Sequence, residues 1–238
     1  MTATARLHFA DAGEAADLAA FLARLIHYDK AAAVRLQAAG DTLAVFGRPP
    51  SFEVLAIRTA RLAEPYGHGL DAPLGTTPGT PLDVTVSAGE FLESVGESAQ
   101  SETAAGIAAV PGAVTGPPWA GVLPPRGGWR QEPGLPAPDT VRELVRVAVG
   151  EFRSRVEQLP AERRVRAELD RVGREIWSRT IGETPLPVRA AHAAQALGFL
   201  RGDALTLLSS GAWLRLRTAY GSVAVRRAGA VGLPVTPA

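Results

Sequence analysis

The hydrophobic positions of the first hundred residues follow two periods, which predict helices on a sheet. Residues 13–28 predict a helix, because their apolar side chains recur every three or four positions, at Leu18, Phe21, Leu22, Leu25 and Ile26. Asp11 and Glu14 form a capping box before this helix, and Ser87 and Glu90 predict a second, shorter one. The alternating pattern of strands covers residues 6–9, 33–38, 42–46, 52–62 and 82–86.

The last hundred residues change to helical spacing and then back to alternation. Apolar positions predict a helix of about five turns that ends at Leu159, and Thr140 with Glu143 predicts its N-terminal cap. A second helix is predicted from Pro160 to Trp177, and an alanine-rich third over residues 188–200. Three strands of a β-meander follow, over residues 205–208, 213–218 and 222–227.

These elements predict an α+β protein with a helix-on-antiparallel-sheet domain at 1–97 and a three-helix domain with a β-meander at 139–238. The connector at 98–138 is rich in glycine and proline. It also carries Trp119 and Trp129, and a disordered linker seldom holds so much apolar area. We therefore expect both indoles to dock on a folded half; the alternative is that they anchor a partner.

Composition separates the two halves by charge. Residues 1–138 hold 9 basic and 14 acidic residues, whereas residues 139–238 hold 16 and 10. The basic half could therefore attract an anionic partner, although the two halves could equally neutralise one another or face solvent. Lys30 is the only lysine, and we attribute the arginine bias to a GC-rich genome before reading it as a nucleic-acid signal.

Several classes of protein are excluded or disfavoured. Cysteine is absent, so thiol chemistry and disulfides are impossible. We find no apolar run of about 18 residues and no signal peptide, and we expect a cytoplasmic protein without a membrane partner. No nucleotide-binding, hydrolase or metalloprotease motif is present. We expect no catalytic residue, metal or cofactor, and the one loop that could hold an acid–base site contains Tyr66, His68 and Asp71.

The meander predicts a candidate binding surface. Alternation on its middle strand places Trp213, Arg215 and Arg217 on one side and two leucines on the other. Arg226 of the next strand is expected on the arginine side. The arginines could also be gatekeepers against strand aggregation.

The order of three helices and a β-hairpin is also that of a winged-helix domain, with residues 188–200 as the recognition helix. The turn before that helix is longer than usual, and its alanines offer little to a groove.

Three hypotheses follow. The first is a non-catalytic binding protein that uses the connector or the Trp213/Arg215/Arg217 surface for an unknown protein partner or a second copy of itself. The second is a winged-helix-like nucleic-acid binder. The third is a small-molecule enzyme that uses the 65–71 loop.

Three segments resemble landmarks of an uncharacterised protein family from high-GC actinobacteria. They are Leu123-Pro124-Pro125-Arg126-Gly127-Gly128-Trp129, Leu197-Gly198-Phe199-Leu200 and Gly211-Ala212-Trp213-Leu214-Arg215-Leu216. The resemblance covers mainly residues 120–227. It implies a cytoplasmic protein of unknown function, and it transfers no site residues.

Overall fold

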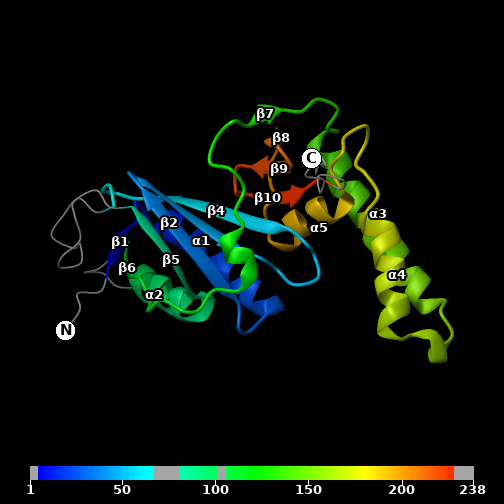
Figure 1. Ribbon diagram of the computed structural model, residues 1–238, viewed down its shortest axis with the longest axis horizontal. Coiled ribbons are helices and arrows are strands. Elements are labelled where there is room, and N and C mark those ends of the chain that lie inside the picture. Colours follow the sequence, from blue (N-terminus) through cyan, green and yellow to red (C-terminus); the bar gives the residue numbers. More distant parts are fainter. Residues whose placement is uncertain (1–4, 67–80, 101–105, 228–238) are drawn as a thin grey trace, which may run out of the picture. The chain divides into compact units, whose positions relative to one another are not determined.

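The chain divides into two compact units, Met1–Leu123 and Pro124–Ala238. The computed structural model describes residues 5–66, 81–100 and 106–227. Each unit combines helices with antiparallel strands, which confirms the predicted α+β class (Figure 1). The boundary between the units lies inside the predicted connector. The reason is strand pairing: one short strand before the boundary pairs within unit 1, and another after it pairs within unit 2.

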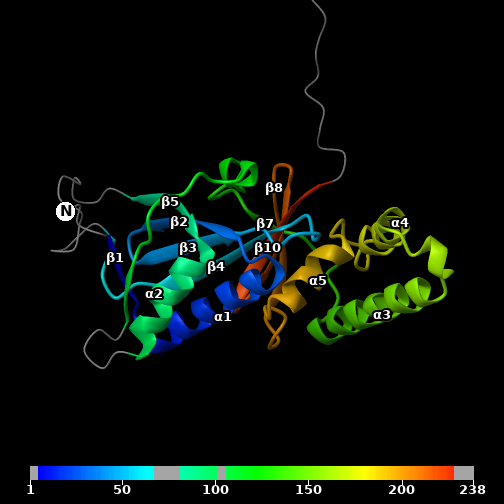
Figure 2. The ribbon, with the colours of Figure 1, turned by 90° about the horizontal axis from the view of Figure 1, so that it is seen from below.

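Unit 1 packs two helices on a four-stranded sheet. The strand order is β5-β2-β3-β4, and β1 and β6 form a separate pair. Helices α1 and α2 lie side by side on one face of the sheet (Figures 1 and 2). The elements are β1 Arg6–His8, α1 Ala12–Tyr28, β2 Ala33–Ala39, β3 Thr42–Gly47, β4 Leu55–Arg61, β5 Leu82–Ser87, α2 Ala88–Gln100, β6 Ile107–Ala109 and the 3-10 turn η1 Pro118–Gly121.

The strand predicted over 52–62 is shorter than its sequence pattern. It begins only at Leu55, because the chain before it is not extended: Ser51 and Glu53 have φ angles of 68° and 52°, outside the β region. The helix-covered face of this strand also carries Arg58, which is 7% exposed. Its Nη2 donates to Asp17 Oδ2 at 3.0 Å and lies 3.8 Å from Glu14 Oε2. Two carboxylates on α1 thus pair with this buried charge.

Two strand-helix-strand segments of unit 1, β1-α1-β2 and β5-α2-β6, share one pairing rule. The first strand of each segment pairs antiparallel with the last strand of the other. Their helices also begin alike, with Asp11-Ala12-Gly13-Glu14 and Ser87-Ala88-Gly89-Glu90. In both, the cap side chain accepts a hydrogen bond from the glutamate N–H, at 2.9 Å and 3.4 Å. Such an exchange of strands is expected when a two-fold axis, here between α1 and α2, relates the two segments.

Unit 2 combines three helices with four strands in the order β10-β9-β8-β7. Helices α3 and α4 lie side by side (Figures 1 and 2), and α5 contacts both β10 and α3. The elements are β7 Arg130–Gln131, α3 Pro138–Glu157, the 3-10 turn η2 Ala161–Arg163, α4 Arg166–Trp177, α5 Val188–Ala196, β8 Leu205–Ser210, β9 Trp213–Thr218 and β10 Gly221–Arg226.

The cap predicted for the first helix of unit 2 is wrong. Helix α3 begins at Pro138, and its N-cap residue Ala137 offers no side-chain acceptor. Proline suits this position because its missing N–H would have no partner there. Thr140 therefore lies inside the helix. Glu143 does not cap the helix either, since it accepts hydrogen bonds from Arg146 at 2.5 Å and 2.7 Å.

Candidate functional site

One face of the unit 2 sheet gathers cationic and aromatic side chains. Trp213, Arg215 and Arg217 alternate along β9, while the intervening Leu214 and Leu216 are fully buried. The strand register completes this surface, which we call the Trp/Arg face. Its cross-strand neighbours are Gln131, Thr206, Leu208, Ser210, Ser222, Ala224 and Arg226.

Trp129 also lies against this face. Its Nε1 donates to the carbonyl of Pro125 at 3.0 Å, and its ring centroid is 5.7 Å from the Arg215 guanidinium. The loop is held to β8, because the Ser210 hydroxyl donates to the carbonyl of Gly127 at 3.2 Å. Gly128 has a φ of 74°, which lets the chain turn here without strain. Trp129 and Arg215 thus form a cation–π pair.

Arg215 is the most enclosed cation of the face. It is half-buried, and its Nε donates to the hydroxyl of the buried Ser222 at 2.8 Å. Burial lowers the pKa of Arg215 from its ordinary value, and the positive charge of Arg217 lowers it further. Arg215 therefore holds its charge against both desolvation and a like charge.

A second cation–π pair lies on the same face. The Arg226 guanidinium is 5.3 Å from the ring of Trp213, its partner in the strand register. Arg217 and Arg226 are exposed, while Trp129 and Trp213 are half-buried. Strands β7 to β10 contain no Asp or Glu. Within the described ranges, no carboxylate forms an ion pair with any of the three arginines of the face.

Several arginines of α3, α4 and the turn after α4 form ion pairs with carboxylates. Between α3 and α4, Arg155 binds Glu175 through two hydrogen bonds of 2.8 Å. Hydrogen bonding to Arg155 holds the pKa of Glu175 below its ordinary value, and Arg179 has the same effect on Glu151. These ion-paired arginines differ from Arg215, Arg217 and Arg226, which share one face without a carboxylate partner in the described ranges.

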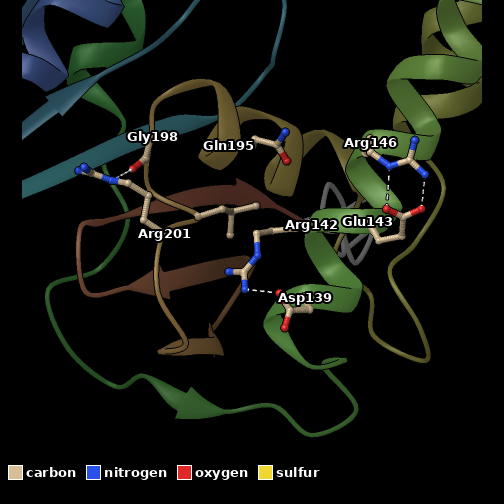
Figure 3. A pocket seen from close by; sticks show the side chains of 8 residues that line it. Asp139, Arg142, Glu143, Arg146, Gln195, Gly198 and Arg201 are labelled. Carbon is tan, nitrogen blue, oxygen red and sulfur yellow. Dashed lines mark hydrogen bonds and ion pairs between the residues drawn. The ribbon is translucent and has the colours of Figure 1, made fainter.

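A pocket with a volume of about 670 Å³ lies between the first half of α3 and the end of α5 (Figure 3). Its charged groups are already paired: Arg142 binds Asp139 at 2.5 Å, and Arg146 binds Glu143. Arg201 points to its own turn, where its Nε donates to the carbonyl of Gly198 at 2.8 Å. A charged ligand would have to displace these partners, so the pocket is a weaker candidate than the Trp/Arg face.

Most of the predicted acid–base loop lies outside the part of the chain that the structure describes. His68 and Asp71 lie outside the described residues. Tyr66 is tied back through its N–H to the carbonyl of Gly40 at 2.9 Å, and burial raises the pKa of its hydroxyl. In the described part of the chain, no three His, Asp or Glu residues are grouped to hold a metal ion.

Helix α5, the predicted recognition helix, exposes few side chains. It is nine residues long, and five of them are buried: Val188, Ala190, Ala191, Ala193 and Ala194. His192 stacks on Trp177 with a centroid separation of 4.4 Å, and burial lowers its pKa. Only Gln195 is exposed. Sequence reasoning missed the His192 stack, because no local pattern joins α4 to α5.

Trp119 belongs to unit 1, not to the Trp/Arg face. It lies half-buried in η1, which is tied to the sheet because Arg35 donates to the carbonyl of Ala120. Arg35 also forms an ion pair with Asp83 at 2.6 Å. The two connector tryptophans thus lie in different units and do not build one surface within either unit.

The described segments include no helix whose length and hydrophobicity would let it cross a membrane.

Three comparisons relate the chain to known proteins. The crystal structure of the DNA polymerase sliding clamp from Pseudomonas aeruginosa with ligand is similar to it with a TM-score of 0.46 and 13% identity, over 100% of this chain and 68% of that chain. A search of the curated proteins found no match. Two families match units of the chain: the domain of unknown function DUF8185 at residues 124–230 and the domain of unknown function DUF8010 at residues 2–121. The second match spans half of the sequence, and the chain therefore belongs to the DUF8010 family.

Proposed function

We propose that the protein is a non-catalytic binding protein and that the Trp/Arg face of unit 2 holds an anionic partner. One observation carries this proposal: Arg215, Arg217 and Arg226 share a face without a carboxylate partner in the described ranges. The surrounding charge supports it, because residues 124–238 hold 18 basic and 11 acidic residues. A net positive unit attracts anions over a Debye length of about 8–10 Å.

The partly buried position of Arg215 gives an anion a reason to prefer this face. Repulsion between Arg215 and Arg217 is screened less there than between fully exposed charges. A bound anion would offset this repulsion, because it attracts both arginines and accepts hydrogen bonds from their guanidinium N–H groups. A paired arginine, such as Arg155 with Glu175, gains much less from the same anion.

Heparin, used as a generic polyanion probe, tests the proposal on the full chain. We compare the salt concentration that elutes the wild type, Arg217→Glu and Arg153→Glu from a heparin column. Both variants change the net charge by the same amount, and both positions are exposed. Arg153, however, lies on α3 rather than on the face. We expect Arg217→Glu to elute at markedly lower salt and Arg153→Glu to elute close to the wild type.

Two results would contradict the proposal. Equal shifts of both variants would mean that heparin senses net charge alone. A wild-type protein that passes through the column at low salt would mean that the face does not hold polyanions. Circular dichroism of each variant verifies that the fold is retained.

A further inference from the structure

We propose that the anionic partner is single-stranded nucleic acid, which the Trp/Arg face binds by base stacking and phosphate contacts. This inference rests on the proposed function and names its partner class. It draws on the arrangement of aromatic and cationic groups, on the position of α5, and on the chemistry that the face lacks.

One aromatic and two cationic side chains follow one another on this face of β9 at a fixed interval. Trp213, Arg215 and Arg217 are separated by two residues each, or about 6.6–6.8 Å along a strand. Trp129 adds a second indole beside Arg215. Proteins that bind single strands combine these two elements, a cationic track for the backbone and aromatic rings for the bases. An acidic peptide would use the guanidinium groups but would have no need of two indoles.

The position of the indoles favours unpaired bases over a duplex. Trp129 and Trp213 are half-buried on a sheet face, and a ring in such a position can stack only on a base that is free of its own helix. Reading a duplex groove requires a helix or ribbon that enters it. Helix α5, which stands where a winged-helix domain has its recognition helix, is covered by packing within unit 2.

The face is also poor in groups that distinguish bases. Among its side chains, Gln131 is the only amide, and neither Asn nor an acid is present. Stacking and phosphate contacts tolerate any sequence, because every base has a π-face and every nucleotide a phosphate. We therefore expect little sequence preference.

Fluorescence anisotropy of the full chain with three labelled probes tests this inference. The probes are an oligothymidine of about 12 nucleotides, a duplex of the same length and a polyglutamate peptide of similar charge. We expect the oligothymidine to bind tightest and to quench tryptophan emission. Its affinity should fall with salt, with a log–log slope that Arg217→Gln reduces by about 0.7, the value for one phosphate contact on a single strand.

Substitution of the indole separates stacking from charge. Trp213→Ala should weaken oligothymidine binding roughly tenfold or more with an unchanged salt slope, and Trp213→Phe should restore most of the loss. Trp119→Ala, the half-buried tryptophan of unit 1, is the matched control and should bind as the wild type does. Trp213→Phe also keeps the test valid if the alanine variant does not fold.

The outcomes separate this inference from the proposed function. Polyglutamate binding that Arg217→Gln weakens, with no preference for oligothymidine, overturns the nucleic-acid inference and leaves the binding face intact. Tighter binding of the duplex, or equal losses in Trp213→Ala and Trp119→Ala, also overturns it. If no polyanion binds at low salt, both proposals fail.

Discussion

Gly221 should tolerate no side chain, because a buried ring occupies the place of its Cβ. It begins β10 with a φ of 150°, and a Cβ built on it would lie 2.7 Å from two ring carbons of Phe199. Non-bonded carbons prefer about 3.5–4.0 Å, so the ring or the strand would have to move by roughly 1 Å. Phe199 is 2% exposed and has little room to move. We therefore expect Gly221→Ala to destabilise unit 2.

The magnitude follows from two costs. Overpacking of a tight core costs about 1–3 kcal/mol, and a non-glycine residue in this backbone region costs about 1–3 kcal/mol more. Together they predict a loss of about 2–6 kcal/mol and a decrease in Tm on the order of 10 °C. Gly211→Ala is the matched control, since Gly211 has a φ of 54° with nothing within 4 Å of its Cβ. It should lose only the backbone part.

Thermal unfolding of the full chain, followed by tryptophan emission, measures the effect. The signal reports mainly on unit 2, which holds Trp129, Trp177 and Trp213 of the 4 tryptophans. The double variant Gly221→Ala/Phe199→Leu removes the ring edge, so its loss should be smaller than the sum of the single losses. If Gly221→Ala loses no more than Gly211→Ala, or if the double variant is additive, the argument from ring contact is wrong.

Three further predictions concern the face, a histidine and the two helix caps. Arg215→Met should lower the free energy of unfolding by about 1–2 kcal/mol, because it leaves the buried Ser222 hydroxyl without its hydrogen-bond donor. Adding Ser222→Ala should restore stability but not polyanion binding. Urea unfolding measures the first effect and heparin elution the second. Burial holds the pKa of His192 in the folded protein below its ordinary value, so the unfolded chain binds more protons. Stability should therefore fall as the pH drops below about 6.5. His192→Phe should flatten this pH dependence in urea titrations between about pH 5 and 8. Asp11→Ala should cost about 1 kcal/mol in the same titration, and Ser87→Ala less, because the hydrogen bond of Ser87 is longer.

Local patterns predicted most of the helices and strands, and long-range pairing explains what they missed. Helix α1 follows from its apolar spacing and from Asp11, whose side chain caps it. The late start of β4 depends on two residues with positive φ, and neither Ser51 nor Glu53 is a residue type that announces this conformation. The pairing of β6 and β7 with distant strands cannot be read from three- and two-residue segments.

The candidate face was predictable in part for the same reason. Alternation alone places Trp213, Arg215 and Arg217 on one side of a strand. The contact between Arg215 and Trp129 depends on how a loop more than eighty residues earlier in the chain folds onto β8, and no local pattern carries that information. The hydrogen bond from Arg215 to Ser222 likewise depends on the register between β9 and β10.

The exchange of strands in unit 1 means that β1 cannot form its strand pair until β6 has been synthesised. On the ribosome, β1 (Arg6–His8) emerges about a hundred residues before its partner β6 (Ile107–Ala109). At typical rates of synthesis, of about 5–20 residues per second, β1 waits for several seconds before the strand that pairs with it is made. A fragment that stops before residue 107 never forms this pair. Expression of unit 1 by itself should therefore extend beyond Val110, whose N–H donates to the carbonyl of Ala5 at 2.8 Å.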